Sequence, residues 1–495
     1  MRTIPVAFAL AVVSTLAVTP LVRLLAIRVG AIDHALSSRK IHGRPVPRLG
    51  GLAVVLAFYA PLTGLFFWDT GVGRLFWENG RQAIALIIGG CAIAALGVFD
   101  DLRGSSATKK LAVQFAVAAL MWWAGFRVER ISTPFGAPLE LHLLAIPVTL
   151  LWIAGVTNAL NLIDGLDGLA GGVALAAVGA MFFVSFDSGQ LLMALFMASL
   201  GGALLGFLAY NFHPASIFLG DTGSMFLGFV LATTSLQANE KASAAVALLV
   251  PLVALGLPIG DTLLSMGRRA IRGQRIFAGD RRHIHHRLMD LGLSQRSTVL
   301  LLYGVCVILA GISVALSRAN ATQTIGYLAG VLVLAFMVLT VAGYVGLEEA
   351  RKLGQERKRN LELRAAVRAA GERSRHALDP EELWKVVKDV VPALGATCAI
   401  LTVVERNGDT KRTEFAFGFD EAGPELLRAR FSLLGERPDE GGLELGWPDG
   451  RKTVGRDTEI AVELLCEHVY TALQRFEATR KTIASGNRKV VSLRR

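Results

Sequence analysis

Residues 158–172 read NALNLIDGLDGLAGG and connect two long apolar stretches, 141–158 and 167–186. Each stretch is close to the roughly 20 residues that an α-helix needs to cross the hydrocarbon core of a bilayer. Carboxylates and amides at the ends of membrane helices are costly, and they usually have a partner or a function. We therefore predict that this segment joins two transmembrane helices and places polar side chains at a membrane surface.

Similar apolar runs occupy most of the first 346 residues. The chain has 495 residues, of which 53% are hydrophobic and 18% are charged, and its mean hydropathy is +0.49. These values are too apolar for a single soluble globule of this length. The pattern predicts an all-α polytopic membrane protein with about eleven transmembrane helices. The predicted spans lie near residues 4–27, 49–68, 82–99, 110–126, 141–158, 167–186, 190–210, 223–238, 243–265, 297–316 and 323–346.

Basic residues are concentrated in alternate loops. They follow the first apolar run rather than precede it, which indicates a membrane anchor with its N-terminus outside instead of a signal peptide. The formal net charge of +11 is then explained by membrane orientation, and we expect no nucleic-acid partner. The four cysteines form no CxxC pair. The loops predicted to be cytoplasmic are 28–48, 100–109, 158–167, 211–222 and 266–296.

The composition becomes polar after Gly346. Residues 347–376 predict a charged helical linker, and residues 377–480 predict a small cytoplasmic α+β domain that resembles GAF domains. Within it we expect helices over 379–394 and 458–473, strands over 397–404 and 412–419, and turns around GWPDG at 446–450. The basic tail, 481–495, is predicted to be disordered. No nucleophile, metal or phosphate-loop pattern occurs in this part, which favours a regulatory or interaction role with a partner.

Acidic and amide side chains cluster at the predicted cytoplasmic ends of three helix pairs. Oxygen ligands of this kind suit Mg²⁺, which prefers one or two carboxylates together with substrate phosphate and water. Any single member has an alternative role as a helix cap. Several clusters on one face favour a metal-bound phosphate site instead. The clusters comprise Asp100 and Asp101; Asn158, Asn161, Asp164 and Asp167; and Asn211 and Asp221.

Basic side chains face these acids from the same side. The segment GDRRHIHHRL (279–288) contains His283, His285 and His286 beside Arg282. A zinc site is one interpretation, but the arginines repel a cation, and arginine with imidazole favours phosphate binding. An orientation signal explains the arginines without the histidines. The same two explanations, orientation signal or substrate contact, apply to Lys40, Arg48 and Lys109.

These motifs together resemble the bacterial polyprenyl-phosphate N-acetylhexosamine 1-phosphate transferases. RKIHGRPVPRLGG, GVFDDLRG, NALNLIDGLDGLAGG, FHPASIFLGDTGSMFLG and RRHIHHRL are similar to the family's motifs and occur in its order, across about residues 1–346. Several long motifs in the right order are a specific signal. HGRPVPRLGG, HIHH and LPIGDT, which contains Asp261, resemble the branch that uses UDP-N-acetylglucosamine. The resemblance does not extend to the last third of the chain.

The resemblance implies roles for the site residues. Asp100, Asp101 and Asp221 would be catalytic, with Mg²⁺ or Mn²⁺ on Asp221 and Asp164. The substrates would be a UDP-N-acetylhexosamine and undecaprenyl phosphate, handled by a multi-pass enzyme of the bacterial inner membrane, in contact with membrane lipid and expected to form a homodimer. Substrate binding would involve Asn161, Asp164, Asp167, Asn211, His283, His285, His286, Arg282, Lys109, Lys40 and Arg48.

Three alternatives remain open at this stage. The first is the phospho-N-acetylmuramoyl-pentapeptide transferase branch of the same family. The second is an intramembrane aspartyl protease, which Asp100 and Asp221 suggest but which lacks its GxGD pattern here. The third is a cation transporter, although transport sites tend toward the membrane midplane and internal repeats. Direct displacement by the lipid phosphate is preferred to a covalent aspartyl intermediate.

Overall fold

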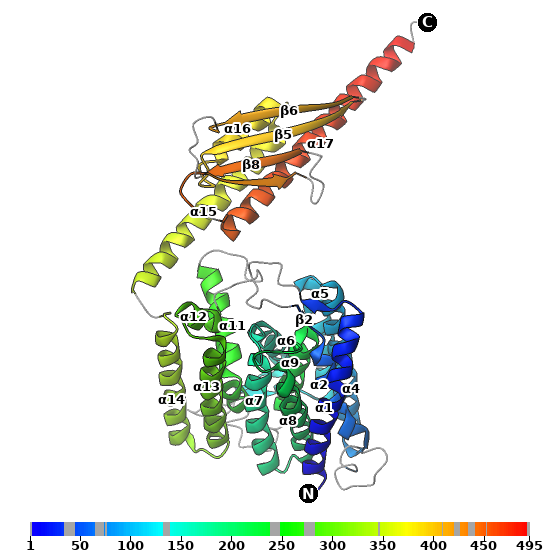
Figure 1. The fold of residues 1–495 in the computed structure, drawn as a ribbon, viewed down its shortest axis with the longest axis vertical. Coiled ribbons are helices and arrows are strands. Elements are labelled where there is room, and N and C mark those ends of the chain that lie inside the picture. The colour runs from blue at the N-terminus through cyan, green and yellow to red at the C-terminus, as the bar shows by residue number, and fades with distance from the viewer. Residues whose placement is uncertain are drawn as a thin grey trace. The chain divides into compact units, whose positions relative to one another are not determined.

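The protein is described by a computed structural model that divides into two compact units (Figure 1). One unit comprises Met1–Gly267 with Gly279–Gly346, and the other comprises Arg268–Ala278 with Leu347–Arg495. Each unit has its own hydrophobic core, so each is described by itself. The structure describes residues 2–33, 45–64, 74, 77–131, 139–237, 248–271, 283–344, 347–407, 409–419, 426–433, 441–451 and 453–492.

The first unit is a bundle of helices (Figure 1). Two short antiparallel pairs accompany them, β1 (Ile32–Asp33) with β2 (Val46–Pro47) and β3 (Arg130–Ile131) with β4 (Leu139–Glu140). A 3₁₀ turn, η1 (His142–Leu144), precedes α6. The helices are α1 (Thr3–Arg28), α2 (Gly50–Gly64), α4 (Gly80–Arg103), α5 (Ala107–Ala124), α6 (Ala145–Ile163), α7 (Leu169–Asp187), α8 (Leu191–Asn211), α9 (Gly220–Gln237), α10 (Leu249–Ala254), α11 (Gly256–Ile271), α12 (Ile284–Asp290), α13 (Gln295–Leu316) and α14 (Ala321–Val341).

Seven helices of the described chain are long and apolar enough to cross a membrane, namely α1, α4, α6 with its 3₁₀ turn, α7, α8, α13 and α14. The chain is therefore a multi-pass membrane protein. The other predicted spans coincide with α2, α5, α9 and the pair α10–α11, which are shorter or less apolar. The mostly helical membrane architecture agrees with the sequence, whereas the exact number of eleven spans stays a prediction.

Helix α9 lies at the centre of the bundle. Every side chain from Thr222 to Gln237 is buried, and α9 packs against α2, α4 and α6. A helix that is buried on all sides carries no polar face, and the polar side chains of α9 are hydroxyls, the Gln237 amide at its C-terminal end and Asp221 in its first turn. That first turn begins at Gly220 and contains Asp221.

Glycines allow this central helix to approach its neighbours closely. A Cβ atom added to Gly97 of α4 would lie 2.3 Å from the Cα of Thr222, and one added to Gly51 of α2 would lie 2.0 Å from the backbone N of Gly223. Both contacts are with backbone, which cannot rotate away. The start of α9 is therefore wedged between the start of α2 and the last turns of α4.

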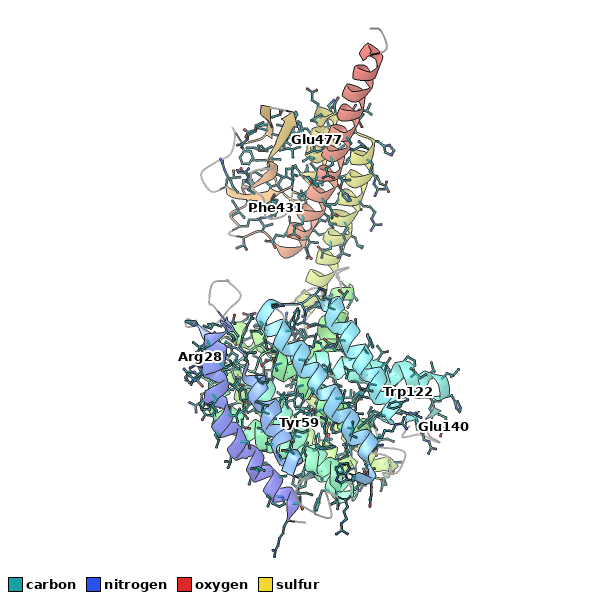
Figure 2. All side chains as sticks on the ribbon, turned by 90° about the vertical axis from the view of Figure 1, so that its right-hand side faces the viewer. Arg28, Tyr59, Trp122, Glu140, Phe431 and Glu477 are labelled. Atoms are coloured by element: carbon teal, nitrogen blue, oxygen red, sulfur yellow. The ribbon has the colours of Figure 1, made fainter. Side chains whose placement is uncertain are left out.

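Aromatic and cationic side chains gather where α5 ends, at the opposite end of this helix from Lys110 (Figure 2). The Arg127 guanidinium lies 4.6 Å from the ring centroid of Trp122. Arg130 and Glu140 form an ion pair of 2.8 Å across the β3–β4 pair. Such groups are typical of a membrane–water interface, where an amphipathic ring is flanked by charge.

The second unit contains both helices and strands. A four-stranded antiparallel sheet has the order β6-β5-β8-β7. Helices pack against it through a core that includes Trp447, whose indole N–H donates to the Leu394 carbonyl at 3.3 Å. The elements are α15 (Leu347–His376), α16 (Pro380–Val390), β5 (Cys398–Asn407), β6 (Asp409–Phe417), β7 (Leu427–Ser432), β8 (Gly441–Trp447) and α17 (Arg456–Ser492).

The second unit differs from the sequence prediction in three respects. The sequence prediction does not include strands β7 and β8. In β8, the glycines of GGLELGW (441–447) and burial on both faces remove the alternation of apolar and polar residues that marks a strand. Helix α15 is more than a linker, since its residues Leu363, Val367 and Ala370 belong to the unit's core. Helix α17 continues to Ser492 and so includes most of the tail that was predicted to be disordered.

Replacing Gly97 by alanine is expected to destabilise the membrane unit. The added methyl group meets backbone at 2.3 Å, and overpacking of this kind costs typically about 1–3 kcal/mol. Gly155→Ala on α6 is the matched control, because a Cβ there meets no atom within 4 Å. Thermal unfolding of the detergent-solubilised protein measures both. Equal melting temperatures for the two variants would contradict the close approach of α4 and α9.

Candidate active site

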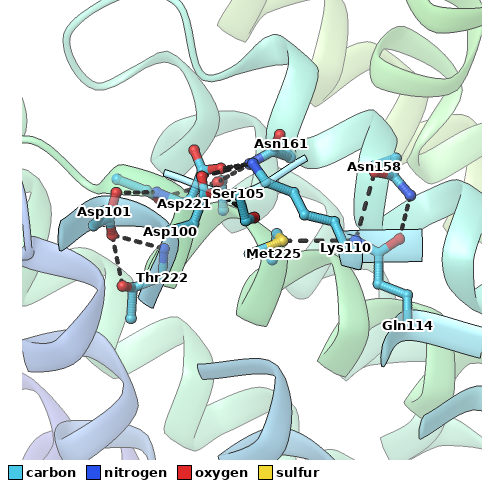
Figure 3. A network of polar contacts seen from close by, with 12 residues as sticks. Asp100, Asp101, Ser105, Lys110, Gln114, Asn158, Asn161, Asp221, Thr222 and Met225 are labelled. Atoms are coloured by element: carbon cyan, nitrogen blue, oxygen red, sulfur yellow. Dashed lines mark hydrogen bonds and ion pairs between the residues drawn. The ribbon is translucent and has the colours of Figure 1, made fainter. Parts of the chain in front are cut away.

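The ends of three helices bring two aspartates and a lysine together (Figure 3). The Lys110 ammonium on α5 lies 2.6 Å from Oδ2 of Asp100 on α4, and it also donates to Oδ2 of Asp221 on α9. The Ser105 hydroxyl donates to Oδ1 of Asp100 at 2.5 Å. Lys110 thus lies between the carboxylates of Asp100 and Asp221, which belong to helices far apart in the sequence.

Asp101 has a different task from its neighbour Asp100. Its carboxylate is buried and accepts hydrogen bonds from the backbone N–H groups of Asp221 and Thr222, both at 3.0 Å, and from the Thr222 hydroxyl at 2.6 Å. It therefore caps the N-terminus of α9, where unpaired N–H groups and the helix dipole favour an anion. These three bonds give Asp101 a positioning role at the start of α9, and its predicted catalytic role stays a prediction.

Beside this cap, the segment 48–51 forms backbone contacts with residues 218–219, which directly precede α9. Arg48 forms a parallel bridge with Phe218, and the backbone N–H groups of Gly50 and Gly51 donate to the carbonyls of Phe218 and Leu219 at 2.9 and 2.7 Å. The segment 48–51 therefore fixes the approach of the chain to Asp221. Arg48 is half-buried, and its Nε has no hydrogen-bond partner among the described residues.

Gly220 makes the turn into α9 possible. Its φ of +72° lies in the left-handed region, which favours glycine. A Cβ at this position would also lie 2.7 Å from Oδ2 of Asp101. The glycine thus allows Asp101 to reach the helix end, and Asp221 follows directly with its side chain directed at Lys110.

The central motif contributes Asn161 and Asp164 from the end of α6. The Asn161 amide donates to Oγ of Ser224 at 3.0 Å, which ties α6 to α9. Asp164 has no hydrogen bond or ion pair within the part of the chain that the structure describes. Burial of its carboxyl, followed by the negative charges of Asp221, Asp101 and Asp167, raises the pKa of Asp164 well above its usual range. The negative charge around Asp164 therefore favours the binding of a cation.

Asp167 and Asn211 shape the loop that precedes α9. The Asp167 carboxylate accepts from Nδ1–H of His213 at 2.8 Å and from the Ala215 N–H at 3.1 Å. The buried Asn211 amide donates to the Ile217 carbonyl at 2.9 Å. Both residues thus hold the loop, and Asn211 supports Asp221 only through it. His213 belongs to the motif that marked this loop, but its pairing with Asp167 was not foreseen.

The three histidines occupy different environments. His283 is buried and donates from Nδ1 to Oδ2 of Asp261 at 2.8 Å. His285 is 1% exposed, and neither of its ring nitrogens has a partner among the described residues. The ring of the half-buried His286 lies 4.3 Å from that of His285. Burial, followed by the proximity of His286, lowers the pKa of His285 to about 3, so this ring is neutral at physiological pH.

His285 lies close to the acidic cluster because Gly165 has no side chain that would occupy the position of its ring. A Cβ added to Gly165 would lie 2.4 Å from Nε2 of His285, so the imidazole rests against the backbone next to Asp164. The structure therefore brings one of the three histidines to the NLIDGLDG motif.

The remaining predicted contacts have mixed outcomes. Lys109 is exposed, and its neighbour Lys110 is the lysine that meets the aspartates. Helical periodicity contained this signal, because Lys110 lies four residues before the buried Gln114 on α5 whereas Lys109 does not share that face. Lys40 and Arg282 lie outside the described residues.

The acidic cluster offers carboxylate oxygens to a metal ion. The described residues contain no group of three or more His, Cys, Asp or Glu side chains arranged to hold one. Mg²⁺ does not need such a group, because one or two carboxylates with substrate phosphate and water satisfy it. Asp221 and Asp164 meet this requirement, and their interaction in the acidic cluster leaves negative charge to be neutralised. The residues fit an open magnesium site and not a closed cage.

Comparison with known proteins gives consistent matches. The profile described as Glycosyl transferase family 4 matches residues 83–239, which include the aspartates of the cluster. A protein of Bacillus subtilis strain 168, named probable undecaprenyl-phosphate N-acetylglucosaminyl 1-phosphate transferase, is 38% identical over 64% of this chain and 86% of its own length.

Two further relatives extend the comparison. The decaprenyl-phosphate N-acetylglucosaminephosphotransferase of Mycolicibacterium smegmatis is 36% identical over 59% of this chain and 77% of its own length. A phospho-N-acetylmuramoyl-pentapeptide-transferase of Levilactobacillus brevis is 30% identical over 55% of this chain and 85% of its own length. The identity is thus higher to these two N-acetylglucosamine phosphotransferases than to the muramoyl-pentapeptide transferase.

Replacing Asp101 by alanine is expected to destabilise the protein. Two backbone N–H groups and one hydroxyl at the start of α9 lose their buried acceptor, and each unsatisfied group costs about 1–3 kcal/mol. Thermal unfolding in detergent measures the effect. Asp187→Ala, which removes an exposed ion pair with Arg318, serves as the control and should leave the melting temperature nearly unchanged. Equal shifts would argue against the capping role.

Proposed function

The chain belongs to glycosyl transferase family 4, and we propose that it transfers N-acetylglucosamine 1-phosphate from UDP-N-acetylglucosamine to a polyprenyl phosphate, releasing UMP. The observation that carries this proposal is the Asp100–Lys110–Asp221 cluster, with Asp164 beside it, at the ends of helices in a multi-pass membrane protein. The named activities of its relatives support the same reaction. Undecaprenyl phosphate is the proposed acceptor.

The reaction forms one phosphorus–oxygen bond and breaks another. An oxygen of the lipid phosphate attacks the sugar-bound phosphorus of the UDP-sugar, and the bond to the other phosphate breaks as UMP leaves. A phosphate monoester has a second pKa near 6, so the lipid phosphate is largely dianionic at neutral pH. The protein therefore supplies mainly position and charge, as is usual for phosphoryl transfer, and needs no strong general base.

The residues of the cluster suit these two tasks. Lys110 carries the positive charge that a diphosphate requires, and Asp100 together with Ser105 holds its side chain in place. Asp221 and Asp164 are the residues that would hold Mg²⁺, or Mn²⁺, which when bound supplies neutralisation of the diphosphate charge. Asp101 fixes Asp221 by capping α9.

The membrane location follows from the pairing of substrates. The polyprenyl tail stays in the lipid while its phosphate meets a water-soluble nucleotide, so the reacting groups belong at a helix end and not at the bilayer centre. The excess of arginine in alternate loops supports a cytoplasmic site in the bacterial inner membrane. The product would initiate the synthesis of a cell-surface polysaccharide.

The alternatives are less well supported. The relatives from Bacillus subtilis and Mycolicibacterium smegmatis, both named for the transfer of N-acetylglucosamine phosphate, are 38% and 36% identical to the chain, compared with 30% for the muramoyl-pentapeptide transferase. A protease mechanism needs two aspartates free to share a catalytic water, whereas Asp100 is held by Lys110 and Ser105. A transporter would place its acids near the midplane, whereas these acids lie at helix ends.

The purified protein is expected to release UMP from UDP-N-acetylglucosamine only when undecaprenyl phosphate and Mg²⁺ are both present. Asp221→Asn should lower kcat by about 100-fold or more, because it removes a carboxylate that would hold the Mg²⁺ needed to neutralise the diphosphate charge. Coupled detection of UMP measures the rate. Release that is independent of lipid, or an unimpaired Asp221→Asn enzyme, would refute the assignment.

Asp164→Asn is expected to raise the Mg²⁺ concentration for half-maximal activity by about 10- to 100-fold. The variant removes a carboxylate that has no protein partner in the described residues, so its effect should fall on cation binding more than on folding. A Mg²⁺ titration of UMP release measures it, with the exposed Asp187→Asn as the control of equal charge change. An unchanged Mg²⁺ dependence would exclude Asp164 as a ligand.

A further inference from the structure

Helix α12, which carries the HIHH segment, is anchored by one carboxylate of α11. Oδ2 of Asp261 accepts from Nδ1–H of His283 at 2.8 Å, and Oδ1 accepts from the backbone N–H of Ile284 at 2.9 Å. A carboxylate only accepts, so Nδ1 of His283 must carry the proton of this bond. Asp261 is 2% exposed and His283 is 4% exposed. An ionisable group this deeply buried is costly, which points to a function for the pair.

A second anchor fixes the other side of the same short helix. The Arg287 guanidinium donates to the carbonyls of Ala342 and Gly343, at 3.3 and 2.6 Å, and lies 4.2 Å from the ring centroid of Tyr344. These residues follow the end of α14. Helix α12 is thus held between α11 and the end of α14, so its orientation is determined by side chains from both.

Helix α12 also carries His285, whose ring nitrogens have no hydrogen-bond partner among the described residues. His285 follows the clamped Ile284, is 1% exposed, and rests on Gly165 beside Asp164. Neither of its ring nitrogens is hydrogen-bonded in the described chain. A buried polar group without a partner costs free energy that a ligand can recover. His285 therefore fits a ligand that enters next to Asp164.

We propose that Asp261 and His283 are positioning residues. Together they hold His285 so that His285, and not His283, contacts the donor nucleotide diphosphate. The inference rests on the proposed function, and it revises the expectation that all the histidines of the segment bind substrate. His283 acts through its bond to Asp261, because its Nδ1 is engaged there and its ring is stacked 5.7 Å from that of His285.

Substitutions of His283 separate positioning from contact. In His283→Asn the amide N–H₂ replaces the Nδ1–H donor and keeps the bond to Asp261, so the KM for UDP-N-acetylglucosamine should stay within about threefold of wild type. His283→Ala, Asp261→Ala and His285→Ala should each raise this KM by about 10- to 100-fold, the effect of losing a hydrogen bond to a charged group. The KM for undecaprenyl phosphate should not change.

The double variant Asp261→Ala/His283→Ala tests whether the two residues act as one. Because both belong to a single contact, its KM for the UDP-sugar should be no worse than that of either single variant. Melting temperatures in detergent identify variants that fail to fold. If Asp261→Ala does not fold, Asp261→Asn takes its place, since it puts an NH₂ donor where one of the two accepting oxygens of Asp261 lies. Asp187→Ala is the control that should leave all constants unchanged.

The outcomes are distinct. An inactive wild-type protein would refute the proposed transferase function. With an active wild type, three results would each overturn the inference: a folded Asp261 variant with unchanged KM, a His283→Asn variant as impaired as His283→Ala, or additive effects in the double variant. Intact KM values in His283→Asn with raised values in the three alanine variants and no additivity would establish it.

Discussion

The organisation of the site depends on the carboxylate of Asp101 at the N-terminus of α9. It accepts two backbone N–H groups and one hydroxyl there, and it comes from the last turn of α4. The cap joins two helices that are distant in sequence, and Gly97 and Gly220 remove the side chains that would keep them apart. Without this bond, the N–H groups at the start of a buried helix would have no acceptor.

The acidic residues of the site fall into two groups that differ in how their charge is compensated. Asp101 and Asp167 are satisfied by the protein and hold backbone in place. Asp164 is crowded by other carboxylates and is not satisfied by the described residues, whereas Asp100 and Asp221 share one lysine. Burying such charge is expensive unless a cation or substrate completes the site. Aspartates that are close together in the sequence therefore serve different purposes, because some stabilise the fold and the others are available to a cation or substrate.

The basic side of the site follows the same logic. His283 is satisfied by Asp261, while the ring nitrogens of the buried His285 have no hydrogen-bond partner among the described residues. His283 therefore holds the segment in place, and His285 is available to form hydrogen bonds with a ligand. Within the second unit, Leu363 and Val367 tie α15 to the sheet domain rather than leave it as a free tether.

Hydrophobic runs of about twenty residues determined the membrane character of the chain, because a bilayer imposes their length. Polar motifs at their ends likewise identified the transferase family and most of the residues that meet in the cluster. Only the tertiary structure decided which of Asp100 and Asp101 is engaged in capping, which of Lys109 and Lys110 reaches the acids, and that His283 pairs with Asp261. These distinctions depend on side-chain direction and on contacts between helices far apart in the chain, neither of which local composition encodes. Strand β8 was missed for a related reason, since its burial on both faces erases the alternation that marks a strand.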